Sequence, residues 1–492
     1  MLESAEIGHR TSKRAYAREE PRLREALLNA QFDLSLSRRG PVLLIISGVE
    51  AGGRGETANK LTEWMDPRHI RVVAFADRTP EECSHPPAWR YWKALPPRGR
   101  IGIFMNAWYH ESALARGGID DDALHARLEA IREHEQMLTD EGLVLLKFWI
   151  HLSKSAQKKR LKALDDNPRT SWRVTRADWR AYKLYSQRHD LWEHLLRETS
   201  TGYAPWYVVE GVDERYRYLT VGRILLEALQ GTLSRRPSAI THAITPNAPS
   251  VIDNVKLLRD LDLSKRLTQK QYDRALEREQ GRLAKLTRHK RFALRSLVLV
   301  FEGVDAGGKG SAIRRVTGAL DARRYMTIPV AAPTDEERAH PYLWRFWKHV
   351  PPLGGIAIFD RSWYGRVLVE RVEGYCGAND WMRAYSEINQ FEEQLAEGGA
   401  VIVKLWLQIS KAEQLRRFRA RTHTPFKRFK ITSEDWRNRR KWNDYERAVC
   451  DMVDRTGTEI APWTLVEAED KRFARVKVLA TINDRLERSL AG

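Results

Sequence analysis

Short apolar runs alternate with charged, helix-favouring stretches along the whole chain. The run at 296–301 (SLVLVF) is almost continuously apolar and rich in Val and Leu, which predicts a buried strand. Further apolar runs lie at 70–76, 101–105 and 143–150, and again at 326–331, 356–359 and 400–407. Strands that alternate with helices predict an α/β fold with a mostly parallel sheet flanked by helices.

The pattern is written twice. The sequence GVEAGGRG at 48–55 returns as GVDAGGKG 255 residues later, and WRYWK at 89–93 returns as WRFWK at the same spacing. Further along the spacing becomes 257, where APW at 204–206 pairs with APW at 461–463. Rare residues that match in order over this length predict a tandem duplication.

The chain should therefore consist of two modules, residues 1–240 and 250–492. The seam is expected near 232–251, which is rich in Pro, Ser, Thr and Ala and lacks helical spacing. Each module opens with a charged segment that favours a helix, at 11–36 in the first and at 257–291 in the second.

The sequence FEGVDAGGKGS at 301–311 predicts a phosphate-binding loop. It follows a strand, and residues 312–316 continue it at helical spacing, so the helix N-terminus adds its partial positive charge to that of Lys309. Ser311 stands one place after the position at which Walker A loops carry Ser or Thr. The alternative is a plain turn that caps a core strand. The loop's flexible positions are Gly303, Gly307, Gly308 and Gly310, whose N–H groups can converge on one anion.

Two carboxylates flank this loop. Asp360 ends the apolar run at 356–359, as a Walker B residue does, and Asp305 lies inside the loop. Carboxylates so placed can bind Mg²⁺ that bridges phosphate oxygens. A helix cap for Asp360 and a turn-stabilising role for Asp305 are the structural alternatives. Their position on either side of Lys309 favours the metal site.

The first module has lost this chemistry. Arg54 stands where Lys309 would be, Glu50 replaces Asp305, Met105 replaces Asp360 and Asn106 replaces Arg361. A thioether does not bind a hard cation, and a forked guanidinium differs from a compact ammonium. We expect the first module to be non-catalytic and to serve as a packing partner or a polyanion-binding platform.

Residues 411–441 form a strongly basic arm. We interpret it as a helical lid, about residues 411–447, that brings guanidiniums to a transferring phosphoryl group; the alternative is a solvated helix face. Trp436 and Trp442 could stack on bases, but their spacing favours helix packing in the core. The arm's cations include Arg416, Arg417, Arg419, Arg421, Lys427, Arg428, Lys430, Arg437, Arg439, Arg440 and Lys441.

The composition of the chain indicates which classes of binding partner it favours. The 492 residues carry a net charge of +19, which favours a polyanion: nucleic acid, an anionic membrane or inorganic phosphate chains. Three widely spaced cysteines indicate reduced thiols, and no apolar run reaches the roughly 18 residues of a membrane helix. We expect a cytoplasmic protein that forms a homo-oligomer and needs neither a membrane nor a nucleic acid as partner.

With these residues placed, the sequence resembles the polyphosphate kinase 2 family, and its two modules are similar to the polyphosphate:AMP phosphotransferase branch. The resemblance covers 11–229 and 257–490. It rests on GVDAGGKG at 303–310, DRSWY at 360–364, KLWLQISK at 404–411 with Gln414 and Arg417, and DW at 435–436 before APW at 461–463.

The resemblance implies a P-loop kinase fold with a helical lid, which uses inorganic polyphosphate as donor and Mg²⁺ (or Mn²⁺) as cofactor. Asp305 and Lys309 would serve the Walker A loop, Asp360 would serve Walker B and bind metal with Asp305, and Arg361 would contact phosphate. The lid residues would be Arg417, Arg421, Lys427 and Lys430. AMP is the implied acceptor and ADP the alternative. An ATP-dependent nucleotide kinase and a non-catalytic polyanion-binding protein are the rivals.

Overall fold

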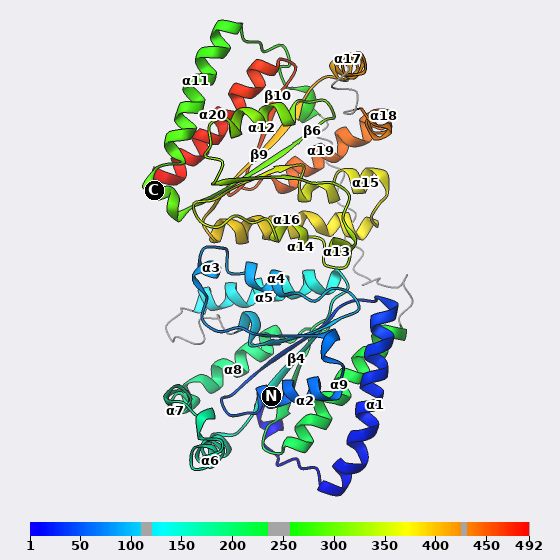
Figure 1. Ribbon diagram of the computed structural model, residues 1–492, viewed down its shortest axis with the longest axis vertical. Helices are drawn as coiled ribbons and strands as arrows, with labels where there is room; N and C mark the ends of the chain where they lie inside the picture. The colour runs from blue at the N-terminus through cyan, green and yellow to red at the C-terminus, as the bar shows by residue number, and fades with distance from the viewer. Residues whose placement is uncertain (110–120, 235–255, 425–430, 492) are drawn as a thin grey trace. The chain divides into compact units, whose positions relative to one another are not determined.

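The computed structural model describes residues 1–109, 121–234, 256–424 and 431–491 (Figure 1). The chain divides into two compact units. The first consists of Met1–Arg78, Tyr91–Thr241 and Pro333–Trp344, and the second of Thr79–Arg90, His242–Ala332 and Arg345–Gly492. The boundary after Thr241 falls inside the predicted seam, most of which lies outside the described residues. Because the stretches 79–90 and 333–344 group with the opposite half, the compact units differ from contiguous sequence modules.

The first unit is built on a five-stranded sheet in the order β2-β3-β1-β4-β5, and every pairing is parallel. The central strand is fully buried up to its last residue, as its continuous apolar sequence predicts. The strands are β1 (Val42–Gly48), β2 (Ile70–Ala74), β3 (Ile101–Met105), β4 (Val144–His151) and β5 (Trp206–Glu210).

Helices cover both faces of this sheet (Figure 1). On one face lie α1 (Lys13–Ser37), α2 (Arg54–Trp64) and α9 (Glu214–Ser234); α5 (Asp121–Asp140) and α8 (Tyr185–Thr199) lie on the other. Ser12 caps α1 by accepting a hydrogen bond from the Ala15 amide, and the helix buries Leu23, Leu27, Ala30 and Leu34 at helical spacing. The shorter helices of this unit are α6 (Lys154–Asp165), α7 (Arg176–Lys183) and α13 (Asp335–Arg338), and α4 (Trp89–Ala94) crosses the boundary at Tyr91.

The second unit repeats this sheet in the order β7-β8-β6-β9-β10, again all parallel. Its strands are β6 (Ser296–Gly303), β7 (Tyr325–Pro329), β8 (Ile356–Asp360), β9 (Ala400–Gln408) and β10 (Trp463–Glu467). The α/β fold with a duplicated, helix-flanked parallel sheet is therefore confirmed. The sequence patterns did not predict the edge strands β5 and β10.

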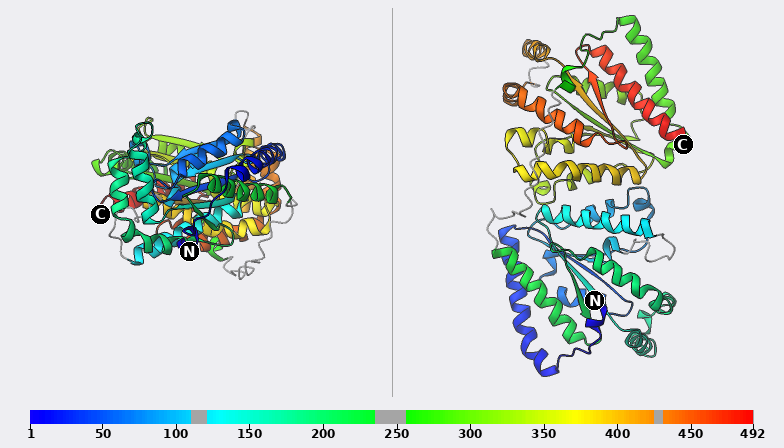
Figure 2. Two further views of the ribbon diagram at one scale, coloured as in Figure 1. Left: turned by 90° about the horizontal axis from the view of Figure 1, so that it is seen from below. Right: turned by 180° about the vertical axis from the view of Figure 1, so that it is seen from behind.

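The helices of the second unit follow the same plan. The long helices α11 (Gln269–Leu286) and α20 (Lys471–Ala491) lie side by side with α12 (Lys309–Thr317) on one face, as both views show (Figures 1 and 2). On the other face lie α16 (Ala378–Glu397) and α19 (Trp442–Thr456). The remaining helices are α3 (Pro80–Cys83), α10 (Lys256–Arg259), α14 (Trp344–Trp347), α15 (Val369–Glu373), α17 (Lys411–Thr422) and α18 (Ser433–Arg440). In the part of the chain that the structure describes, no helix has the length and apolar character needed to cross a membrane.

Candidate active site: a glycine loop and a basic cleft

The glycine loop of the second unit lies where the central strand β6 ends. Residue Phe301 of β6 is in register with Asp360 of β8, so the loop and this carboxylate meet at the same edge of the sheet. Gly303 has φ 146°, and a Cβ there would lie 2.5 Å from the Leu407 carbonyl oxygen. Gly308 has φ 114° and Ala306 φ 63°. The loop thus depends on glycine at its strand end and at the helix start.

Lys309 is the first residue of α12, and its Nζ atom donates to the Gly303 carbonyl oxygen at 2.7 Å. The side chain therefore folds back across the loop. Gly308 caps the helix without a side chain, which leaves the N-terminal amides to face the cleft. A phosphate group can take the place of these missing cap interactions.

The two predicted metal carboxylates differ in their surroundings. Asp305 accepts hydrogen bonds from Arg361 at 3.2 Å and from Asn438 Nδ2 at 2.8 Å. The Asp360 carboxylate has no hydrogen-bond or ion-pair partner among the described residues. No group of three or more His, Cys, Asp or Glu side chains that could hold a metal occurs in the described ranges. This donor set fits Mg²⁺, which uses one or two carboxylates and takes its remaining ligands from phosphates and water.

A cleft of about 660 Å³ opens over the loop. Its charged lining consists of eight cations and four carboxylates, so the cleft is net positive, as binding of a polyanion requires. The predicted residues Gly307, Gly308, Lys309, Gly310, Ser311, Asp305, Asp360, Arg361, Arg417 and Arg421 all line it, together with Arg416 and Asp435 of the basic arm and with Arg314, Glu434, Lys471 and Arg475, which were not predicted to belong to the site. Gly303 instead lines a smaller adjoining cavity. Lys427 and Lys430 lie outside the described residues.

Arg417 lies beneath the loop, with only 4% of its surface exposed. Its guanidinium donates to the carbonyl oxygens of Ala306 and Gly307 and to those of Ala468 and Glu469, while Nε bonds Glu413 at 2.6 Å. These contacts join the loop to the end of β10. Its service in the lid stays a prediction, and this geometry favours a role in holding the loop in shape.

Beside the cleft, across Asp305 and Arg361, lies a smaller cavity of about 90 Å³. Its walls are largely apolar and include Val304, Leu368, Trp406, Trp442 and Val449. The expectation that both lid tryptophans belong to the core was wrong. Trp442 is half-buried and lines this cavity from the first residue of α19, and Trp436 of α18 is 38% exposed with its edge against Phe418.

Glu302 is a buried acid that the sequence reasoning missed. It lines the apolar cavity, is 5% exposed, and accepts a hydrogen bond from Ser362 Oγ at 2.8 Å. Burial raises the pKa of Glu302, although the charges of Lys309 and Arg361 and the Ser362 hydrogen bond act in the opposite direction. A comparison of the two halves could have found the pair, since the first half has Ser47 and Ala107 at these positions.

The first unit keeps the shape of the loop. Gly48, Ala51, Gly53 and Asn106 have φ values of 138°, 59°, 101° and 66°, close to those of their counterparts. Arg54, however, donates to Asn106 Oδ1 at 2.8 Å and forms an ion pair with Glu50 at 2.5 Å. The cation of this loop is therefore already neutralised.

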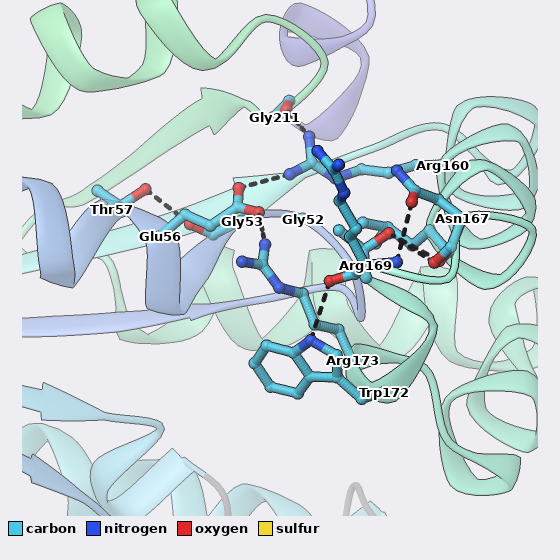
Figure 3. A network of polar contacts seen from close by, with 12 residues as sticks. Gly52, Gly53, Glu56, Thr57, Arg160, Asn167, Arg169, Trp172, Arg173 and Gly211 are labelled. Carbon is cyan, nitrogen blue, oxygen red and sulfur yellow. Dashed lines mark hydrogen bonds and ion pairs between the residues drawn. The ribbon is translucent and has the colours of Figure 1, made fainter.

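A further carboxylate, that of Glu56, forms ion pairs beside the first loop. Glu56 stands where the second unit has Ser311, and it pairs with Arg160 at 2.5 Å and Arg173 at 3.3 Å (Figure 3). It also pairs with Arg217 at 2.9 Å. Arg217 is fully buried and also donates to the carbonyl oxygens of Gly52 and Gly211. Glu56 thus forms ion pairs with three guanidiniums near this loop.

The cleft over the first loop, about 350 Å³, has lost most of its cationic positions. Five of the eight cations that line the second cleft correspond to uncharged or acidic residues: Arg314 to Asn59, Arg361 to Asn106, Arg421 to Leu164, Lys471 to Glu214 and Arg475 to Tyr218. The two units therefore share a scaffold and differ in the electrostatics of their clefts.

A parallel α/β sheet, a glycine loop that leads into a helix, a carboxylate at the neighbouring strand tip and a basic cleft together define a phosphate-binding-loop protein of the kinase-like type. Residues 10–237 and 266–491 match the family described as Polyphosphate kinase 2. The chain belongs to the polyphosphate kinase 2 family.

Relatives that match nearly the whole chain share a large part of its sequence. A protein of Pseudomonas aeruginosa named polyphosphate:AMP phosphotransferase is 56% identical, with 99% of each chain covered. One of the same name from Acinetobacter johnsonii is 36% identical over 95% of this chain and 96% of its own. A crystal structure of a polyphosphate kinase 2 from P. aeruginosa superposes with a TM-score of 0.90 at 54% identity and covers 99% of both chains.

Proposed function

We propose that this protein transfers the terminal phosphoryl group of inorganic polyphosphate to AMP, reversibly, at the cleft of the second unit. The observation that carries the proposal is the pairing of a large basic cleft with a small apolar cavity across Asp305 and Arg361. The cleft suits a chain of phosphates, and the cavity suits the nucleoside of the acceptor.

The names of the relatives support the choice of acceptor. Proteins named for AMP match 95% or more of this chain, whereas an ADP-polyphosphate phosphotransferase of P. aeruginosa matches 43% of it at 39% identity. ADP is the second candidate acceptor, because a relative named for ADP also matches part of this chain.

In the proposed reaction the loop amides and Lys309 hold the phosphoryl group that is transferred. Arg361, fixed by Asp305, faces the same cleft and neutralises charge that develops on it. Asp360 and Asp305 would hold Mg²⁺, which supplies charge neutralisation between phosphate oxygens when bound. A phosphate oxygen of AMP is already anionic, so the residues of this site need only position it and exclude water.

We further propose that the first unit does not transfer phosphoryl groups, because Glu50 and Glu56 neutralise its loop cations and Met105 replaces the metal carboxylate. Three free cysteines support a reducing, cytoplasmic setting. Homo-oligomer formation and the absence of a nucleic-acid partner stay predictions.

The test is product formation from AMP and from ADP, each with polyphosphate and Mg²⁺, and with ATP as a control donor. ADP formed from AMP only when polyphosphate is present would establish the proposal. Faster ATP formation from ADP would change the acceptor, turnover with ATP alone would favour an ordinary nucleotide kinase, and no turnover with any pair would leave a binding protein.

A further inference from the structure

The first unit contains a cavity at the position that corresponds to the apolar cavity of the second. It has about 110 Å³, against about 90 Å³ in the second unit. Gly48, Trp149 and Gln157 line it, and their counterparts Gly303, Trp406 and Gln414 line the other. The space beside the loop has therefore been kept although the loop chemistry has not.

Three side chains in the wall of this cavity bury a polar atom that has no hydrogen-bond partner among the described residues. They are Ser47 Oγ, Trp149 Nε1 and Gln157 Oε1, in residues that are 4%, 6% and 2% exposed. Buried polar atoms without partners are rare and cost free energy, so three around one cavity call for a ligand or bound water.

The second unit shows that this feature is particular to the first. There the indole nitrogen of Trp406 donates to Gln408 Oε1 at 2.8 Å, and Gln414 Oε1 accepts a hydrogen bond from Arg439 at 3.1 Å. The first unit has His151 in place of Gln408 and Tyr182 in place of Arg439. Substitution has thus removed the partners while the tryptophan and glutamine remained.

Three aromatic side chains line each cavity: Tyr109, Trp149 and Trp192 in the first, and Trp406, Trp442 and Tyr445 in the second. Trp192 of α8 stands where the second unit has Val449, and its ring lies 5.6 Å from that of Trp149. Large indole faces suit a flat heteroaromatic ring, and the three residues with unpartnered polar atoms line the same cavity. Arg54 and Arg188 line the cavity; Arg54 is paired with Glu50, and three arginines near the loop are paired with Glu56.

We propose that the first unit binds the nucleoside of adenosine or AMP in this cavity and does not react with it. The inference rests on the proposed function, since the corresponding cavity of the second unit is assigned there to the acceptor nucleoside. The first unit would then be a second, non-catalytic nucleotide site in the same chain.

The test is photolabelling of the full chain with 8-azidoadenosine, followed by peptide mapping. We expect label on α8 in the first unit and on α19 in the second, with AMP and adenosine displacing both. Polyphosphate should leave the α8 label in place. Label confined to the second unit, or α8 label that AMP does not displace, would overturn the inference.

Variants locate the site. Trp192→Ala should lower the α8 label by about tenfold, as expected when a stacking partner of a base is lost, while the α19 label stays. Trp172→Ala is the matched control, because this tryptophan of the same unit is 73% exposed and does not line the cavity. If Trp192→Ala fails to fold, Ala181→Phe fills the cavity from α7 and should have the same effect. An α8 label that survives both changes would refute the assignment.

Turnover separates the two proposals. Loss of α8 label with normal phosphorylation of AMP in Trp192→Ala would support both. Normal turnover in the wild type without any α8 label would refute the nucleoside site and leave the proposed function intact. An α8 label in a protein that does not phosphorylate AMP would leave the site standing and refute the proposed function.

Discussion

A buried histidine should make the first unit sensitive to acid. His134 of α5 is 6% exposed and lies edge to face with Trp108 at 4.8 Å and Trp92 at 5.7 Å. Burial lowers the pKa of His134 from 6.5 to about 4. The second unit has Phe391 at the corresponding position, packed on two tryptophans in the same way. The chain therefore supplies its own control substitution, His134→Phe.

The direction of the pH effect on stability follows from the number of protons that each state binds. Between its folded pKa of about 4 and its unfolded value near 6.5, His134 binds more protons in the unfolded chain, so stability falls as the pH falls through this window. The contribution of neutral His134 to the free energy of unfolding is fully present above about pH 6.5. At about pH 4.5 the free energy of unfolding is lower by about 2.5 kcal/mol. Phenylalanine does not titrate, so His134→Phe should remove this loss.

Hydrogen exchange measured by mass spectrometry can read the effect in one unit. At about pH 7.5 we expect wild type and His134→Phe to protect α5 nearly equally, because a neutral ring replaces a neutral ring of similar shape. At about pH 4.5 the variant should protect α5 better by about 2.5 kcal/mol, equivalent to slower exchange by well over tenfold. Peptides from α16 should not differ between the two proteins. Equal loss of α5 protection in both proteins on acidification would refute the reasoning.

Three further predictions concern the cleft and its duplicate. Asp360→Asn should lower turnover by orders of magnitude with unchanged circular dichroism, and normal turnover would remove Asp360 from the metal site. Met105→Asp in that background should not restore turnover, since the other chemical positions of the first loop remain replaced; measurable rescue would contradict this view of the first unit. Arg417→Lys should lower the free energy of unfolding of the second unit by about 2–4 kcal/mol in urea titrations, because carbonyl oxygens under the loop lose their donor. Arg416→Lys, whose side chain is 70% exposed, is its control and should change stability by less than about 1 kcal/mol, so equal effects would argue against the loop-holding role of Arg417.

The features that sequence patterns predicted are those that arise locally. Continuous apolar runs produced the inner strands, and a glycine sequence between a strand and a helix produced the loop with its strained backbone. The strands β5 and β10 escaped because they lie at sheet edges, are only partly buried and directly follow an Ala-Pro pair that reads as a turn. They are strands because they pair with β4 and β9, which lie far away in the sequence.

The site was less predictable because charge alone does not tell where a side chain lies. Arg417 and Arg421 look alike in the basic arm, yet Arg417 is buried against four carbonyl oxygens of the loop and of the segment after β10. Glu302 directly precedes the loop, but only its burial and its hydrogen bond to Ser362 distinguish it from a surface acid. Partners that are distant in sequence decide both roles.

The duplication also separates what the fold needs from what the cleft needs. In each unit a buried lysine of the fourth strand, Lys147 or Lys404, pairs with a buried glutamate, Glu135 at 2.5 Å or Glu392 at 2.7 Å. Each lysine also donates to a threonine carbonyl oxygen at 2.6 Å. Removing one member of such a pair leaves an uncompensated buried charge and costs about 3–5 kcal/mol, so loss of either partner alone is penalised in both halves. Among the described residues Lys309 belongs to no buried ion pair, and the first unit has Arg54 at this position. The cost of an uncompensated buried charge therefore applies to the lysine–glutamate pair, which both units retain. It does not apply to the cleft residues, which differ between the units.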